Sequence, residues 1–252
     1  MPFRFNSCHL KNFFQITESV VYPYVRVPKT WAASVSDRLQ DQSCKGAIAK
    51  ATENLPDFKP CRTFLKAQCE DQKIDDLTCF LSIMAWGGMR ISNGEKVLPK
   101  WDQIQPTMKK LRAGCIDRGQ AYTEFCNFRK NNPGSGMGPA FFTKLIFFAH
   151  PSHDGYIMDQ WTSRSINLLI DSPKPLVRLA PYIQQKATYS RVVDLNDADT
   201  YQAYCRAVEQ LAKIAVKDGQ AITPEIVEER LFSRGGRPAQ RGRWRQYLLD
   251  NE

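Results

Sequence analysis

Helical periodicity is the feature that most constrains the fold of this chain. From Trp31 onward, segments with apolar residues at helical spacing alternate with short breaks, whereas the alternating apolar and polar runs typical of strands are few. The sequence therefore predicts a mostly α chain. The helices we expect cover residues 31–40, 44–55, 61–69, 75–86, 101–114, 116–130, 139–149, 160–170, 175–186, 198–217 and 223–231, with a loop at 87–100.

The organisation of the chain is that of a single unit. With 252 residues it has the length of one large or two small domains, and neither a repeat nor a low-complexity linker divides it. We therefore expect one unit over residues 1–252. The β-branched stretch "SVVYPYVRV" at 19–27 fits either a short strand or an extended arm, and the sequence alone does not decide between them.

Charge and targeting signals narrow the classes of function. Thirty-five Lys and Arg against 26 Asp and Glu give a net charge of +9, which favours a polyanionic partner, with nucleic acid as the first candidate. The N-terminus lacks the apolar core of a signal peptide, and no apolar run approaches the roughly 18 residues of a membrane span. We expect a cytoplasmic monomer without a membrane partner.

The residues that commonly bind metals are scattered. None of the eight cysteines forms a C-x-x-C pair, so they indicate neither a zinc site nor a disulfide framework. His150 and His153 flank a proline without carboxylate or thiolate neighbours at ligand spacing. The sequence therefore predicts no metal site.

A glycine-rich turn precedes the helix expected at 139–149, in "NNPGSGMGPAFF". Gly134, Gly136 and Gly138, with Met137 between the last two, allow backbone angles that let consecutive amides point outward towards a phosphate. Pro139 suits the first helical position, where its missing N–H costs nothing. The turn is either an anion site or a plain connection between helices.

Two faces are predicted for the helix at 139–149, a core face and a face that could line a cleft. The core stripe consists of Phe141, Phe142, Leu145, Ile146, Phe148 and Ala149. The opposite face consists of Ala140, Thr143, Lys144 and Phe147.

Asp159 lies between apolar "YIM" and the helix that begins "QWTSRSINLL". Helix N-capping is a sufficient role for an aspartate at such a position. A carboxylate held beside apolar residues is also well placed to face a cation that develops on a bound substrate.

Together these segments resemble the helix-hairpin-helix and catalytic-aspartate core of the HhH-GPD superfamily of DNA glycosylases. Gly136-Met137-Gly138 matches the hairpin of that pattern, Asp159 its catalytic acid, and Arg164 and Asn167 its downstream Arg and Asn. The phrase "GPAFFTKLIFF…GYIMDQWTSRSINLL" further resembles a bacterial group of 8-oxoguanine DNA glycosylase-like proteins. The specific match covers about 40 residues plus the C-terminal stretch "FSRGG…RGRWRQYLL", and the N-terminal half agrees only in helical character. The core it implies lies at about 116–170, with a basic segment at 230–245.

This resemblance implies a helix-hairpin-helix DNA glycosylase fold with two helical lobes around a cleft. The hairpin would bind a phosphate of double-stranded DNA, often with a monovalent cation, and the target nucleotide would be flipped out. Asp159 would stabilise the oxocarbenium-like sugar during base excision. The excised base is either a lesion such as 8-oxoguanine or a modified cytosine of phage DNA, removed in antiviral defence. The competing hypothesis is a non-enzymatic helix-hairpin-helix protein that only binds DNA.

Two departures from the superfamily pattern limit the chemistry. Bifunctional members carry a nucleophilic lysine two residues after the hairpin, where this chain has Ala140, with Lys144 one helical turn later. We therefore expect a monofunctional enzyme, with Lys144 as the alternative nucleophile. The cysteine loop of iron-sulfur members is missing as well, so no cluster is expected.

Further candidates come from the cleft face and the C-terminus. Trp86, Met89 and Arg90 follow an apolar helix where the superfamily places its base-gap wedge, although a Trp there is more often core. The expected lining of the base pocket adds Phe147, Gln160 and Trp161. The segment 230–245 fits DNA phosphates and a solvated surface equally well. Its arginines are Arg230, Arg234, Arg237, Arg241, Arg243 and Arg245.

Overall fold

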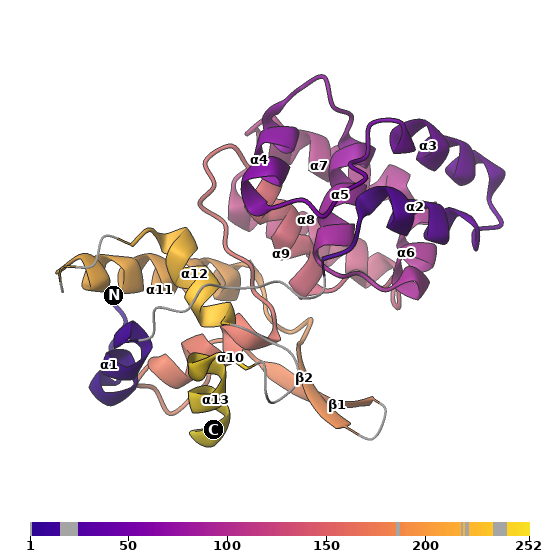
Figure 1. The fold of residues 1–252 in the computed structure, drawn as a ribbon. Coiled ribbons are helices and arrows are strands. Elements are labelled where there is room, and N and C mark those ends of the chain that lie inside the picture. The colour runs from indigo at the N-terminus through magenta and orange to yellow at the C-terminus, as the bar shows by residue number, and fades with distance from the viewer. Residues whose placement is uncertain (1, 16–24, 185–186, 218, 220–221, 234–240) are drawn as a thin grey trace. The chain divides into compact units, whose positions relative to one another are not determined.

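The computed structural model of the 252-residue chain describes residues 2–15, 25–184, 187–217, 219, 222–233 and 241–252. It is mostly helical, as predicted, and divides into two compact units (Figure 1). The first unit consists of Met1–Pro23 and Tyr156–Glu252, and the second of Tyr24–Gly155. The cleft expected between two lobes stays a prediction. No helix in the described parts is long and apolar enough to cross a membrane.

The second unit is an all-helical bundle. Its elements are α2 (Pro28–Ser36), α3 (Gln42–Thr52), α4 (Arg62–Glu70), α5 (Asp76–Trp86), α6 (Ile91–Val97), the 3₁₀ turn η1 (Leu98–Lys100), α7 (Trp101–Arg112), α8 (Arg118–Asn131) and α9 (Pro139–Ala149).

Helix α5 is the centre of this bundle. It packs against α2, α3, α4, α7 and α9, and nearly every one of its side chains is buried. A helix that is apolar all round requires such a position, because it has no face to expose to water. Asp75 caps its N-terminus by accepting a hydrogen bond from the backbone N–H of Thr78 at 2.9 Å.

The arginine at the end of α7 fastens the turn between α4 and α5. The buried guanidinium of Arg112 donates to the backbone carbonyls of Cys69, Ile74 and Asp71 at 2.8 to 2.9 Å. It also forms an ion pair with Asp76 at 2.6 Å. A buried cation is tolerated only when its donors find such partners.

The prediction of a loop at 87–100 is wrong, because this stretch contains α6 and η1. Gly94, within the stretch expected to be a loop, lies inside α6, where a Cβ atom would meet Val35 at 2.8 Å and Trp31 at 2.9 Å. This glycine therefore permits close approach of α6 to α2. Trp31 reinforces the contact by donating from Nε1 to the carbonyl oxygen of Met89 at 2.8 Å.

The first unit combines helices with one β-hairpin. Its elements are α1 (Ser7–Gln15), α10 (Gln160–Leu169), β1 (Leu179–Gln184), β2 (Ala187–Val192), α11 (Ala198–Lys217), α12 (Pro224–Phe232) and α13 (Arg243–Asp250). Helix α10 lies at the centre and contacts α1, α11, α12, α13 and β2.

The prediction of a helix at 175–186 is wrong, because Leu179–Gln184 form strand β1. The two strands pair antiparallel, from Leu179 opposite Val192 to Gln184 opposite Ala187. Pro181 lies in the middle of β1, where it would have broken a helix but fits a strand with an unpaired edge.

The N-terminal segment is fastened to the end of α10. Phe5 forms an isolated antiparallel bridge with Ile170, and Asn6 donates its backbone N–H to the carbonyl oxygen of Leu169 at 2.9 Å. Helix α1 follows and buries Phe13 against Trp244 of α13, with ring centroids 4.9 Å apart. The stretch 19–27, undecided from sequence, falls mostly outside the described residues.

Candidate functional site

The glycine turn connects α8 to α9 and adopts backbone angles that require glycine. Gly134 has φ 76° and Gly136 has φ 79°, both in the left-handed region. Gly136 is constrained a second time, because a Cβ atom would lie 2.8 Å from Cβ and 2.9 Å from Cα of Asn93 in α6. The turn thus packs directly against α6, an element that the sequence analysis missed.

This turn leaves a row of backbone donors unused. The N–H groups of Gly136, Met137, Gly138 and Ala140 have no acceptor among the described residues. Pro139 at the first helical position contributes no N–H, and Gly138 caps α9 without a side chain. Free amides at the start of a helix favour an anion such as a phosphate, so this turn at the start of 11-residue α9 is a candidate anion site.

Side chains beneath the turn hold it in place. Asn132 is buried, accepts a hydrogen bond from Lys100 Nζ at 2.9 Å, and donates to Gln103 Oε1 at 2.8 Å. Arg129 donates from Nη1 to the carbonyl oxygen of Met137 at 3.3 Å. The Met137 side chain is fully buried, so only its backbone can contribute to an anion site.

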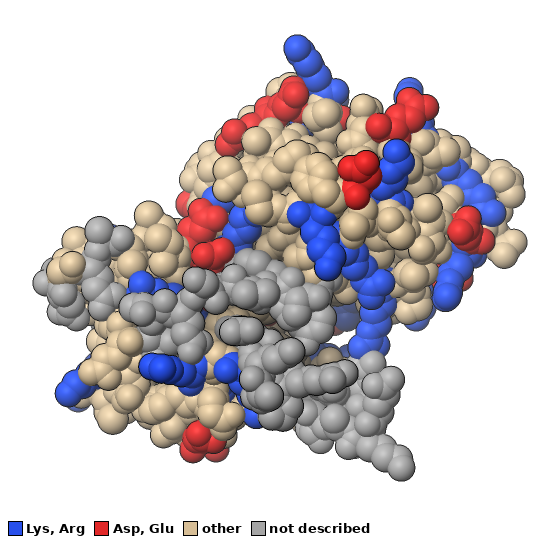
Figure 2. All heavy atoms as spheres, viewed as in Figure 1, with Lys and Arg blue, Asp and Glu red and all other residues tan. Residues whose placement is uncertain are grey.

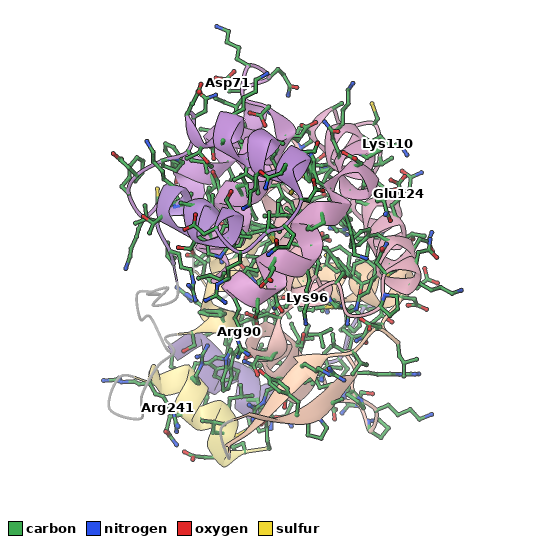
Figure 3. All side chains as sticks on the ribbon, turned by 90° about the vertical axis from the view of Figure 1, so that its right-hand side faces the viewer. Asp71, Arg90, Lys96, Lys110, Glu124 and Arg241 are labelled. Atoms are coloured by element: carbon green, nitrogen blue, oxygen red, sulfur yellow. The ribbon has the colours of Figure 1, made fainter. Side chains whose placement is uncertain are left out.

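Basic side chains are concentrated near this end of the second unit. Arg90 is the N-cap of α6 and Lys96 lies in its last turn, and both lie towards the opposite end of the unit from Asp71 (Figure 3). Figure 2 shows a band of Lys and Arg side chains crossing this unit on the face in view. Such a band attracts a polyanion by long-range electrostatics.

Lys144 bends back towards the start of α9. Its Nζ donates to the carbonyl oxygen of Ala140 at 2.7 Å, and its stem lies where a Cβ on Gly87 would contact Cδ at 2.8 Å. The side chain is buried apart from 8% of its surface. The ammonium therefore lies on the first turn of α9, although its residue is one turn further along.

Asp159 is the N-cap of α10 and closes a capping box with Thr162. Its Oδ1 accepts hydrogen bonds from the backbone N–H groups of Trp161 at 2.7 Å and Thr162 at 3.1 Å. Its Oδ2 has no hydrogen-bond partner within the part of the chain that the structure describes. Only 9% of the residue is exposed, so one oxygen is fixed by the helix while the other is available in a mostly dry environment.

Two arginines contact the ring of Trp161 at the start of α10. The Arg245 guanidinium carbon is 4.0 Å from the centroid of the Trp161 ring, and that of Arg164 is 4.8 Å away. Arg164 also forms an ion pair with Glu252, and burial lowers the pKa of this arginine. These contacts place Arg164 close to the Asp159 turn, but as part of an internal ion pair.

Two further residues of the motif have structural partners. With its amide oriented to satisfy both neighbours, Gln160 donates to the Ser190 carbonyl of β2 at 2.6 Å and accepts from Trp161 Nε1 at 3.3 Å. Asn167 exchanges two hydrogen bonds with the Val177 backbone, at 2.8 and 2.9 Å, and fastens the loop after α10.

The predicted wedge and pocket residues divide by burial. Arg90 is exposed, whereas Trp86, Met89 and Phe147 belong to the core of the second unit. The Trp86 ring contacts Phe148 edge to face, and the Phe147 ring lies under the cations of Arg62 and Lys66, each 4.7 Å from its centroid. Trp86 and Met89 are core residues, as is more often the case for a Trp at the end of an apolar helix.

The C-terminal arginines that the structure describes differ in exposure and contacts. Arg234 and Arg237 lie outside the described residues, as do Gly235 and Gly236. Arg243 is exposed at the start of α13, and Arg241 donates to Gln246 Oε1 at 3.3 Å. Arg245 is buried, stacks on Trp161 and donates to the carbonyl oxygen of Phe232, so it is a core residue.

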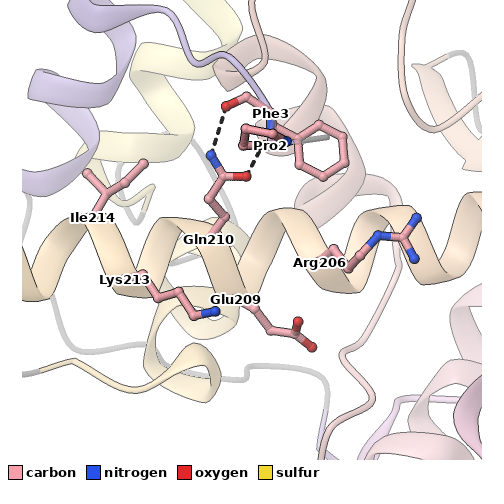
Figure 4. Close-up of a pocket in the computed structure, with 7 residues that line it drawn as sticks. All are labelled: Pro2, Phe3, Arg206, Glu209, Gln210, Lys213 and Ile214. Atoms are coloured by element: carbon pink, nitrogen blue, oxygen red, sulfur yellow. Dashed lines mark hydrogen bonds between the residues drawn. The ribbon is translucent and has the colours of Figure 1, made fainter.

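A separate hollow of about 470 Å³ lies beside α11 in the first unit (Figure 4). Gln210 spans it and holds the N-terminal segment, accepting from the Phe3 N–H and donating to the Phe3 carbonyl, both at 2.8 Å. Arg206 and Lys213 line the same hollow. Within the described residues no group of three or more His, Cys, Asp or Glu is arranged to hold a metal.

The class of protein follows from comparison with known families. A family model described as "Putative 8-oxoguanine DNA glycosylase OGG-like protein" matches residues 27–232. The chain belongs to this family, which implies a helix-hairpin-helix glycosylase fold and DNA as the substrate. Neither a curated protein nor a solved structure matches the chain significantly.

Proposed function

We propose that this protein is a monofunctional DNA glycosylase, which flips a modified base out of double-stranded DNA and hydrolyses its N-glycosidic bond. Family membership supports the class of enzyme, and the environment of Asp159 supports the chemistry. The product is an intact DNA strand with an abasic site.

The glycine turn serves as the phosphate grip in this proposal. Free N–H groups from Gly136 to Ala140 can donate to one phosphate, and the rigid turn loses little conformational freedom when the phosphate binds. A monovalent cation coordinated by the turn would add positive charge at the same place. Arg90 and Lys96 extend the basic surface beyond the turn.

Asp159 is the catalytic carboxylate in this proposal. As the glycosidic bond lengthens, positive charge develops on the sugar, and the base leaves with the bonding electron pair. A carboxylate whose Oδ1 is fixed by two amides presents Oδ2 in one orientation, and its charge stabilises the cation without reorganisation. A water molecule then adds to the anomeric carbon, and its proton passes to the carboxylate or to solvent.

The decisive experiment replaces Asp159 by Asn, which preserves shape and capping while removing the charge. We expect excision to fall by at least about a hundredfold, with DNA affinity retained, because electrostatic groups of this kind contribute on that scale. Asp117→Asn is the matched control, since Asp117 caps α8 with an equivalent capping box in the other unit. Its excision rate should equal that of the wild type.

The alternative function is DNA binding without catalysis, which uses the glycine turn but has no use for a carboxylate at residue 159. It predicts equal behaviour of wild type, Asp159→Asn and Asp117→Asn in every assay. If no DNA substrate releases a base and the two variants bind DNA like the wild type, the glycosylase proposal fails.

The substrate has two candidates, an oxidised base such as 8-oxoguanine and a modified cytosine of phage DNA. The family description favours the first. The familiar 8-oxoguanine enzymes use a lysine at the position where this chain has Ala140, and this difference weakens the case for 8-oxoguanine as the substrate. Incubation with 8-oxoguanine duplexes, alkylated DNA, unmodified phage DNA and phage DNA with modified cytosines separates the candidates by the base released.

A further inference from the structure

Two tyrosines of α11 support the chain that leads into Asp159. Tyr201 and Tyr204 lie one helical turn apart, are fully buried, and stack with their ring centroids 6.4 Å apart. The Tyr201 hydroxyl donates to the carbonyl oxygen of Tyr156 at 3.1 Å, and the Tyr204 hydroxyl donates to that of Ile157 at 2.7 Å. Both hydrogen bonds hold the segment just before the candidate catalytic residue.

The carbonyl of Ile157 connects Tyr204, through Thr162, to Asp159. It accepts a second hydrogen bond, from Thr162 Oγ1 at 2.8 Å. A threonine hydroxyl has one proton, so donation to Ile157 directs its lone pairs elsewhere. Thr162 Oγ1 accepts a hydrogen bond from the backbone N–H of Asp159 at 3.0 Å and lies 3.4 Å from Asp159 Oδ1.

Electrostatics keep the Tyr204 hydroxyl a donor. Complete burial raises its pKa well above the ordinary value of 10.0, and the charge of Glu228 acts in the same direction. The hydroxyl therefore stays protonated over the whole range in which the protein would work. Thr162 is equally inaccessible, so solvent does not replace either hydrogen bond.

We propose that Tyr204 is a positioning residue for Asp159: its hydroxyl fixes the Ile157 carbonyl, which orients Thr162 and thereby the carboxylate. Tyr204 touches neither DNA nor the reacting atoms and acts only through this chain of hydrogen bonds. The inference rests on the proposed glycosylase function. It predicts that Tyr204→Phe, which removes one oxygen atom, impairs stabilisation of the sugar cation while DNA binding is kept.

The test uses two duplexes that need no knowledge of the target base. One carries a pyrrolidine abasic analogue, whose ammonium mimics the cationic sugar, and the other a neutral tetrahydrofuran abasic site. Their ratio of dissociation constants measures how well the Asp159 carboxylate faces a positive charge. We expect a wild-type preference of at least about a hundredfold for the pyrrolidine duplex, as for other transition-state mimics. Tyr204→Phe should lose about tenfold of this preference, with tetrahydrofuran binding unchanged.

Tyr201→Phe is the matched control, because it removes the neighbouring buried hydroxyl from a carbonyl one residue further from Asp159. Its preference should remain that of the wild type, although both variants lose a comparable hydrogen bond and should unfold at similar temperatures. If Tyr204→Phe does not fold, Thr162→Val removes the other hydroxyl of the chain and Thr162→Ser restores it. The first should lose the preference and the second recover it.

The outcomes distinguish failure of the proposed function from failure of the positioning role. A wild type without preference, or one whose preference survives Asp159→Asn, overturns the proposed function itself. A preference that depends on Asp159 but is unaffected by Tyr204→Phe, or by Thr162→Val where that variant is used, overturns only the positioning role. An equal loss in Tyr204→Phe and Tyr201→Phe overturns it too, because it indicates general loosening of the segment.

Discussion

Lys144 Nζ donates a hydrogen bond to the carbonyl oxygen of Ala140. Lys144 follows Ala140 by four residues, which along an ideal helix is about 6 Å. The folded-back side chain removes that distance. A nucleophilic role would require the Lys144 amine to lose a proton and to leave the Ala140 carbonyl for the sugar.

We expect that borohydride will trap no covalent adduct between this protein and its substrate DNA. The abasic strand should stay intact until it is cleaved by alkali. Denaturing electrophoresis of the protein and of end-labelled DNA measures both. A trapped adduct that disappears in Lys144→Ala would instead make Lys144 the nucleophile and the enzyme bifunctional.

The glycine turn offers a matched pair of substitutions. Gly134→Ala should cost about 1 kcal/mol of stability, because its positive φ is strained but a Cβ meets nothing within 4 Å. Gly136→Ala adds a collision with the backbone of Asn93, which no rotamer change relieves. We expect a cost above about 2 kcal/mol and a loss of DNA affinity. Urea unfolding and DNA titration test this, and equal behaviour of both variants would contradict it.

Substitutions of the two arginines of α13 should change the salt dependence of DNA binding differently. Arg243 is exposed, so Arg243→Gln should weaken binding across DNA sequences and reduce the slope of log K against log salt by about 0.9 if it contacts one phosphate. Arg245 is buried on Trp161, so Arg245→Gln should lower the unfolding temperature and leave the slope unchanged. The opposite assignment of the two effects would mean that α13 is placed differently on DNA.

A pH-dependent contribution to stability is expected from Glu124 of α8. It accepts hydrogen bonds from Thr107 Oγ1 at 2.6 Å and from Lys110 Nζ at 2.9 Å; Lys110 and Glu124 are labelled in Figure 3. Burial raises the pKa of this carboxyl, but the two hydrogen bonds outweigh burial and hold the pKa below its ordinary 4.5.

A lowered pKa in the folded state contributes stability above the unfolded value and loses it as the pH falls through the folded value. Glu124→Gln should therefore destabilise the protein near neutral pH, by no more than about 0.5 kcal/mol because the carboxylate is partly screened by solvent. The difference should vanish well below pH 4.5. Urea denaturation at the two pH values measures it, and a difference that grows in acid would reverse the assignment.

The helical periodicity and the local motifs could be predicted from sequence. The predicted helices at 139–149 and 198–217 coincide with α9 and α11, because their caps and apolar stripes are local properties. The glycine turn and the capping aspartate follow for the same reason. Asp159 and its spacing to Gly138 needed no tertiary information.

What could not be predicted depends on contacts between distant segments. Gly94 signals a turn when read locally, and only the side chains of Val35 and Trp31 make it a helix position. Strand β1 is defined by its partner β2 rather than by its own pattern. The support of Ile157 by Tyr204 joins residues 47 positions apart, and no local signal marks it.

The N-terminal segment pairs with residues that are made much later by the ribosome. Phe3 meets Gln210 across 207 positions, and the segment between them contains the whole unit from Tyr24 to Gly155. That inserted unit can complete its own contacts during synthesis, whereas the unit that holds Asp159 must first close this long loop, at an entropic cost that slows folding. The capped aspartate is therefore among the last parts of the molecule to be assembled, and a chain interrupted before residue 210 would carry a formed glycine turn without the contacts that surround α10.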